Sequence, residues 1–179
     1  MPIPSGRTLV LVGGRVALAE MTEEDQPHFQ CWLSGNVKLR ELIDDHHIPT
    51  MEDQMKWFKR IQEPDRKFFS LVTVPGHTLI GNAGFVQIDP QGGSAVLRIT
   101  IGNPGYLGKG LGSEAVALLV RYAFQHAGWD LLNLKVLKGN SRAVRTYEKN
   151  GFKVIREDLR DGKTILTMAL DRPSFSHAS

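Results

Sequence analysis

The chain of 179 residues has one cysteine and no hydrophobic run approaching the roughly 20 apolar residues that cross a bilayer. One cysteine excludes an intramolecular disulfide, and its apolar neighbours predict that Cys31 is a small buried side chain rather than a catalytic thiol. Residues 1–6 lack the basic segment and apolar core of a secretory signal, so we expect a cytoplasmic protein. His and Cys spacings typical of metal sites are also missing, so we expect no metal.

A strong excess of either charge is missing too. Lys and Arg number 22 against 19 Asp and Glu, which gives a net charge of +3 without a basic run. This scattered charge predicts neither nucleic-acid nor membrane binding, although a mild positive surplus suits an anionic cofactor. The length and the 41% hydrophobic content fit one domain over residues 1–179, with its core at about 15–170 and a flexible tail at 173–179. Both a monomer and a homodimer remain open.

Apolar periodicity and turn residues predict the element order ββααβββαβαββ. A hairpin turns at Gly13 and Gly14, where we expect the positive φ that glycine adopts easily. The other expected elements are helices at about 23–33 and 51–61, with an irregular stretch at 34–49 between them, strands at 68–74, 79–88 and 94–101, a helix at 110–127, a strand at 131–137, a helix at 141–150, and strands at 152–159 and 164–170. Strand meanders with one β-helix-β passage predict an α+β, three-layer α/β/α domain rather than a doubly wound Rossmann fold.

A glycine cluster stands between the strand at 94–101 and the helix at 110–127. Gly108, Gly110 and Gly112 expose backbone N–H groups at a helix N-terminus, an arrangement that suits a pyrophosphate. Such a cluster is weak evidence alone, because a structural glycine turn is about as common. Lys109 lies inside the cluster, so the segment matches neither the P-loop nor the Rossmann glycine spacing.

A second segment, residues 140–152, follows one strand later and reads Asn-Ser-Arg-Ala-Val-Arg-Thr-Tyr-Glu-Lys-Asn-Gly-Phe. Together the two segments resemble the acetyl-CoA signature of the GNAT superfamily, and the resemblance extends from Arg15 to Leu170. The second motif is matched at Asn140, Ala143, Tyr147, Lys149, Gly151 and Phe152. The first motif departs from the family, because Leu107 stands where an Arg or Gln is usual.

The resemblance implies a mostly antiparallel sheet, flanked by about four helices and splayed where acetyl-CoA binds. The strand that ends at residues 99–101 is expected to separate from the strand at 131–136, so that pantetheine pairs with a free strand edge. The cofactor-binding residues that this implies are Ile99, Thr100, Ile101, Leu107, Gly108, Lys109, Gly110, Leu111, Gly112, Ser113, Asn140, Ala143 and Lys149.

The resemblance also implies a catalytic role for Tyr147, as the acid that protonates the leaving CoA thiolate. A phenol is protonated at neutral pH and is able to donate to a thiolate. The alternative is that Tyr147 only packs its helix against the sheet. Relatives often carry a Glu base on the strand before the glycine cluster, but residues 95–98 contain no carboxylate. The alternatives for the base are Asp44, Asp45, His46, His47 and Asp89.

These features predict an N-acetyltransferase that joins acetyl-CoA and a primary amine in a ternary complex. The first two helices resemble the branch that acetylates ribosomal-protein N-termini, aminoglycosides or amino-sugar nucleotides. Trp32, Glu41, Asp44 and Asp45 are expected to bind the acceptor, because the acids suit a cationic amine. The rival interpretations are a non-catalytic acyl-CoA-binding module, against which Tyr147 argues, and a plain interaction domain, which leaves both motifs unexplained.

Overall fold

The structure is a computed structural model that describes residues 7–173. Within them, eight strands form one sheet in the order β1-β2-β3-β4-β5-β6-β8-β7. The strands are β1 Leu9–Val12, β2 Val16–Glu20, β3 Lys67–Thr73, β4 Leu79–Asp89, β5 Ser94–Ile101, β6 Leu131–Leu137, β7 Lys153–Arg160 and β8 Lys163–Asp171. The α-helices are α1 Gln26–Gly35, α2 Val37–Leu42, α3 Met51–Arg60, α4 Leu111–Arg121 and α5 Ser141–Lys149, with short 3-10 turns η1 Glu23–Asp25 and η2 Pro104–Tyr106 and a π-helical turn η3 Tyr122–His126.

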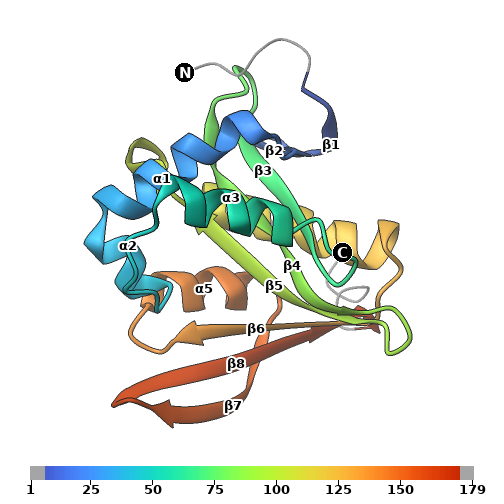
Figure 1. Ribbon diagram of the computed structural model, residues 1–179. Helices are drawn as coiled ribbons and strands as arrows, with labels where there is room; N and C mark the ends of the chain where they lie inside the picture. Colours follow the sequence, from blue (N-terminus) through green and yellow to red (C-terminus); the bar gives the residue numbers. More distant parts are fainter. Residues whose placement is uncertain (1–6, 174–179) are drawn as a thin grey trace.

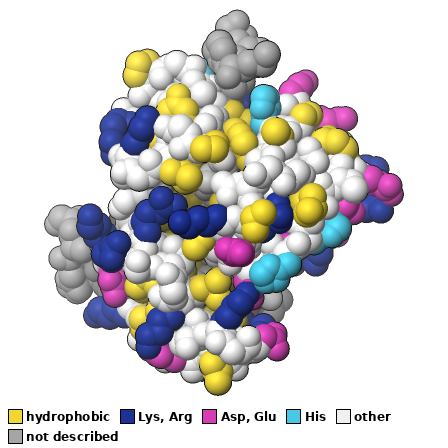
Figure 2. Space-filling model, turned by 90° about the vertical axis from the view of Figure 1, so that its left-hand side faces the viewer, with side chains coloured by type: hydrophobic (Ala, Val, Ile, Leu, Met, Phe, Trp, Pro, Cys, Tyr) yellow, Lys and Arg dark blue, Asp and Glu magenta, His cyan; other side chains and the backbone are white. Residues whose placement is uncertain are grey.

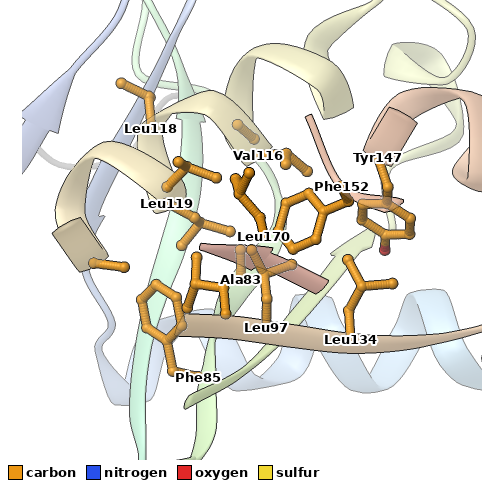
Figure 3. Close-up of a cluster of buried hydrophobic side chains, with 14 of the residues drawn as sticks. Ala83, Phe85, Leu97, Val116, Leu118, Leu119, Leu134, Tyr147, Phe152 and Leu170 are labelled. Carbon is orange, nitrogen blue, oxygen red and sulfur yellow. The ribbon is translucent and has the colours of Figure 1, made fainter. Parts of the chain in front are cut away.

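Helices cover both faces of the sheet, which confirms the predicted three-layer α+β architecture (Figure 1). On one face, α4 and α5 pack on a core cluster that includes Leu119, Tyr147 and Phe152 (Figure 3). On the other face, α1 and α3 contribute to a smaller cluster around Phe29, with Trp32 and Trp57 packed against it. No helix in this part of the chain is long and apolar enough to cross a membrane.

All neighbouring strands are antiparallel except β5 and β6, and this exception opens the sheet. The parallel pair is in register only from Ser94 opposite Leu131 to Val96 opposite Asn133. Beyond that point β5 and β6 diverge, as the left half of Figure 1 shows. The expected splay between these strands is therefore confirmed, and its apex lies just after Val96.

Three expectations about local structure were wrong. Residues 34–49 are not wholly irregular, because Asn36 caps α2 by accepting from the Leu39 N–H at 2.9 Å. Cys31 is exposed, since α1 turns its Phe29 side to the core and Cys31 points away. The turn glycines do not take positive φ. Gly13 is needed for space instead, because a Cβ there would lie 2.9 Å from the Val16 carbonyl oxygen.

Most other boundaries agree with the sequence to within one or two residues. The helix expected at 110–127 consists of α4 and η3 in succession. At the last hairpin, Asp161 and Gly162 both have positive φ, as the Asp-Gly turn predicts. The proposed tail at 173–179 lies outside the described residues, apart from Pro173.

Candidate active site

The glycine cluster forms the loop that starts α4. Gly108 and Gly110 have φ values of 73° and 77°, and Gly110 is the N-cap of the helix. This left-handed backbone is strained for residues with a Cβ, which explains the two glycines. Within residues 7–173, no hydrogen bond involves the backbone N–H groups of residues 108–113. The loop therefore presents a row of free donors at a helix N-terminus, the geometry of an anion site.

Contacts on two sides fix this loop. The Asn150 side-chain amide, at the end of α5, donates to the Ser113 carbonyl and hydroxyl oxygens at 3.2 Å. On the other side, Arg15 donates from Nη1 to the Lys109 carbonyl oxygen at 3.0 Å and forms a 3.1 Å ion pair with Glu114. The start of α4 is thus attached to α5 and to the β1–β2 turn.

The edge of β5 next to the splay carries three of the predicted cofactor residues. Ile99, Thr100 and Ile101 pair with β4 but have no partner on β6. Their backbone groups on that side are free for an extended ligand, in the manner of an added strand. Gly112, on α4, lies close to this edge, since a Cβ there would be 3.9 Å from Ile101 Cγ1. The structure therefore brings the glycine loop and the β5 edge together.

Tyr147 lies on the inner side of α5 and is only 8% exposed. Its ring packs edge-on against the Phe152 ring, with 6.0 Å between the two ring centres. Figure 3 shows its hydroxyl directed past Leu134 of β6. Burial raises the pKa of Tyr147 to about 12, against a smaller lowering by the positive charge of Arg98. The phenol is therefore fully protonated at neutral pH, and its hydroxyl makes no hydrogen bond to any described residue.

Arg98 was not predicted as a site residue. It follows the last β5–β6 pair by two positions and is exposed, whereas Leu97 beside it is buried in the α4 cluster. Successive side chains alternate between the faces of a strand, so Arg98 lies on the face opposite α4. Lys135 of β6 is also exposed, and neither cation forms an ion pair within the described residues. The only sequence feature that could have identified Arg98 as a site residue is its charge in the middle of an otherwise mostly apolar strand.

Residues of the second motif have local structural contacts. The Asn140 side-chain oxygen caps α5 by accepting from the N–H of Ala143, a half-buried residue, at 3.2 Å. Lys149 is exposed at the end of the same helix, and Leu107 is half-buried after η2. Leu111 is buried in the core, so only its backbone faces the loop. The cap explains why Asn stands at the start of this helix.

The predicted acceptor residues lie on α1, on α2 and in the loop between α2 and α3, and they do not form one cluster. Trp32 packs so closely on the end of β5 that a Cβ at Gly102 would collide with its ring. Asp44 forms a 2.6 Å ion pair with Lys163 of β8, which joins the α2–α3 loop to the β7–β8 hairpin. Glu41 is exposed, and Asp45 accepts from a backbone N–H in its own loop.

The alternatives for the base are also engaged elsewhere. The His46 ring lies 3.3 Å from Lys163 Nζ, and the His47 ring lies 3.1 Å from Asp53. Asp89 accepts from the N–H groups of residues 91 and 92 in the β4–β5 turn. None of these side chains is hydrogen-bonded to Tyr147, and no group of three or more His, Cys, Asp or Glu residues between 7 and 173 is arranged to hold a metal ion.

The face that contains the mouth of the splay is on the left in Figure 1 and toward the viewer in Figure 2. Acidic, basic and hydrophobic side chains are interspersed there (Figure 2). Charge alone therefore does not identify one class of acceptor on this face.

Comparisons with known proteins identify the family of the chain. The model of the Acetyltransferase (GNAT) domain family matches residues 15–153. The chain is 21% identical over 175 residues to mouse alpha/beta-tubulin-N-acetyltransferase 9, covering 92% of this chain and 72% of the relative. It is 29% identical over 141 residues to an uncharacterized N-acetyltransferase, p20, from Bacillus licheniformis, covering 77% and 79%.

Solved structures show the same fold. Spermidine N-acetyltransferase from Vibrio cholerae, in complex with CoA and spermine, has a TM-score of 0.82 and 17% identity, covering 90% of this chain and 98% of that one. Aminoglycoside acetyltransferase AAC(6')-Ib, in complex with coenzyme A, has a TM-score of 0.74 and 23% identity over the same shares of the two chains.

Proposed function

The chain belongs to the GNAT acetyltransferase family, and from that premise we propose that it transfers the acetyl group of acetyl-CoA to a primary amine. The main support is that β5 and β6 separate after the pair Val96–Asn133, with the Tyr147 hydroxyl directed past Leu134, the next β6 residue, and Gly112 close to Ile101 at the other end of the unpaired edge (Figure 3). The free N–H groups of residues 108–113 suit the pyrophosphate, and the unpaired edge at Ile99–Ile101 suits pantetheine.

The residues at the apex support direct transfer between two bound substrates. Bond formation between the amine nitrogen and the acetyl carbon breaks the carbon–sulfur bond, and the sulfur leaves as a thiolate. Tyr147 donates its phenolic proton to that sulfur and then regains one from solvent, while the amine gives up its own proton to water. Since burial keeps Tyr147 protonated across the neutral range, the donor form is always present.

The acceptor belongs to the group of protein N-termini, aminoglycosides, amino sugars and other small primary amines. The solved relatives with spermine and coenzyme A support such an acceptor, and Trp32, Glu41, Asp44 and Asp45 are proposed to contact it. Because the base alternatives are engaged in other contacts, we propose that the amine loses its proton to water rather than to a dedicated carboxylate.

The test is a panel of primary amines from these classes, assayed with acetyl-CoA by following release of the CoA thiol. Turnover that depends on the amine, together with mass spectrometry of the N-acetylated product, is the expected result. Tight CoA binding without thiol release for any class would contradict catalysis and favour the non-catalytic module. Failure of CoA to raise the melting temperature would contradict the cofactor itself, because a ligand of the native state stabilises it.

A further inference from the structure

The first GNAT motif lacks its usual Arg or Gln in this chain, since Leu107 occupies the position. A cation from a distant segment lies beside the same loop. The Arg15 guanidinium, from the β1–β2 turn, donates to the Lys109 carbonyl oxygen at 3.0 Å. A Cβ at Gly110 would lie 3.4 Å from Arg15 Nη2, so the guanidinium runs next to the N-cap of α4.

Arg15 is held in place by the first turn of α4. One oxygen of Glu114 accepts from the backbone N–H groups of Arg15 at 2.6 Å and Val16 at 3.3 Å, while the other pairs with the guanidinium. Burial opposes ionisation of Glu114, but these backbone N–H groups and Arg15 lower its pKa below 4.5. Gly13 permits the approach, because a Cβ there would lie 3.0 Å from the carboxylate. The turn, the carboxylate and the arginine form one connected unit.

Some hydrogen-bond donors of Arg15 and of the glycine loop next to it have no acceptor in the described part of the chain. Arg15 Nη2 makes no hydrogen bond to any residue between 7 and 173, and 58% of the Arg15 side chain is exposed. The N–H groups of residues 108–113 beside it are also free. The Lys109 side chain is not counted among these free donors, because its ammonium nitrogen lies 5.2 Å from the centre of the Tyr106 ring. Adjacent free guanidinium and backbone donors are suited to phosphate oxygens.

We propose that Arg15 binds the pyrophosphate of CoA directly and supplies the cation that the motif lacks at Leu107. The inference rests on the proposed function, since it assigns a new ligand to the same cofactor site. The Nη2 group donates to a phosphate oxygen, while Nε and Nη1 keep their contacts with Glu114 and Lys109. Glu114 acts as a positioning residue, because it orients the guanidinium without touching the cofactor.

The experiment compares the dissociation constants of CoA, of dephospho-CoA, which lacks only the 3′-phosphate, and of pantetheine, which lacks the pyrophosphate and the nucleoside, for wild type, Arg15→Gln and Arg15→Lys. The effect expected for CoA should be the same for dephospho-CoA. Loss of a charge-assisted hydrogen bond weakens binding by about 10- to 100-fold, so Arg15→Gln should lose this much affinity for CoA and none for pantetheine. Arg15→Lys should recover part of the loss. In kinetics, Arg15→Gln should raise the KM for acetyl-CoA and leave kcat unchanged.

Arg121 provides a matched control. It ends α4 and donates to the Val12 carbonyl oxygen at 3.0 Å, so it joins the same helix and hairpin about 15 Å along the axis from Leu111. Arg121→Gln should therefore leave the CoA dissociation constant at the wild-type value. The fold should survive Arg15→Gln, because the backbone N–H groups of residues 15 and 16 still bind Glu114; melting temperature and circular dichroism check this.

Three outcomes overturn the inference in different ways. If wild type binds CoA no better than pantetheine, there is no pyrophosphate recognition, and the cofactor assignment fails as well. If Arg15→Gln retains wild-type affinity for CoA, the arginine is not a ligand, although the proposed function stands. If Arg15→Gln and Arg15→Lys both lose CoA and pantetheine equally and melt earlier, Arg15 has only a structural role.

Discussion

The two ends of the proposed site differ in how firmly the protein holds them. At the open end near α4, the loop is fixed by Arg15 and Glu114 on one side and Asn150 on the other. At the acceptor end, the α2–α3 loop is joined to the β7–β8 hairpin by one exposed ion pair, between Asp44 and Lys163. Exposed ion pairs contribute little to stability, so the contact between this loop and the hairpin is held weakly.

This difference indicates a division of tasks. A common cofactor requires a fixed backbone, because its recognition relies on N–H groups whose positions the fold determines. Acceptor recognition relies on side chains in a loop, where sequence changes with little cost to the fold. Substitutions at the α4 loop should therefore affect acetyl-CoA alone, and substitutions in the α2–α3 loop should affect the amine alone.

The largest effect is expected for Gly110→Asp. A carboxylate at the N-cap of α4 places a negative charge and a Cβ where the pyrophosphate must approach, so CoA binding should become undetectable. The measurement is the shift in melting temperature on addition of CoA, supported by calorimetric titration. The position also has a φ of 77°, so the variant should lose some stability as well.

Gly128→Asp is the control for that strain. Gly128 has a φ of 76° and no atom within 4 Å of an added Cβ, but it lies beyond the far end of α4. It should lose similar stability and still respond to CoA. A normal CoA response in Gly110→Asp would contradict the assignment of the loop.

The next effect concerns Tyr147→Phe, at the point where the two ends of the site meet. The substitution removes the hydroxyl and keeps the ring that packs against Phe152. General acid catalysis contributes ~10²- to 10⁴-fold, so kcat should fall in this range while CoA affinity and melting temperature stay near wild type. The comparison needs conditions in which chemistry limits turnover.

A different pattern would assign Tyr147 to packing. The variant would then melt earlier and lose cofactor affinity and turnover together. Wild-type kcat in Tyr147→Phe would leave the thiolate to be protonated by water.

The same contrast explains which parts of the molecule the sequence could predict. The glycine loop and the strand boundaries follow from local signals, namely strand periodicity and glycines before a helix, whereas the splay was expected only from the resemblance to the GNAT superfamily. Gly108 and Gly110 are recognisable in the sequence because their backbone has positive φ, a conformation that favours glycine over other residues. Helix starts and turns of this kind depend on neighbours in the chain, and most were predicted well, with the Gly13–Gly14 turn and α2 as the exceptions.

The rest depends on contacts between distant segments. Arg15 and Glu114 are 99 residues apart, and Asp44 and Lys163 are 119 apart, so no local pattern links either pair. Gly13 was expected to supply positive φ, but it supplies space instead, because a Cβ there would crowd both the Val16 carbonyl oxygen and the Glu114 carboxylate. Short helices such as α2 also escape periodicity, because six residues give fewer than two turns.

A moderate effect is expected at the acceptor end, where the two members of one ion pair should act in opposite directions. Lys163→Met frees the Asp44 carboxylate, so the KM of a cationic amine should fall, whereas Asp44→Asn should raise it, each by ~3- to 10-fold. The acetyl-CoA KM should not change. The measurement is steady-state kinetics with the best amine of the panel.

The pH dependence of this effect follows from the pKa of Asp44. Its hydrogen bond with Lys163 lowers that pKa below 3.8, so the carboxylate is charged at all neutral pH values and, on the acidic side, is neutralised only as pH falls through the lowered pKa. The KM changes should therefore be constant from pH 6 to 9.

Lys138→Met removes another exposed pair, with Glu157, and serves as the control that should leave KM unchanged. If Lys163→Met and Asp44→Asn both kept the wild-type KM for the amine, as the control does, the acceptor would bind elsewhere.

The smallest effect is expected for Arg98→Gln, at the apex of the splay. The positive charge of Arg98 lowers the pKa of Tyr147, which burial raises to about 12, so removing the charge raises this pKa further. A phenol with a higher pKa is a weaker proton donor, and kcat should fall by ~3- to 10-fold. The active, protonated form persists below the pKa of Tyr147 and is lost only above it. Both proteins therefore keep their donor from pH 7 to 10, and the ratio of their kcat values should be constant over that range.

Arg98→Lys separates this electrostatic effect from a direct contact with the acceptor. A lysine keeps the positive charge near Tyr147 but not the planar guanidinium, so kcat should return close to wild type. If Arg98 instead bound the amine substrate, Arg98→Gln would change the KM of the amine and leave kcat intact. That result would move Arg98 to the acceptor end of the site and make the recognition of the amine, rather than the donation of the proton, depend on this strand.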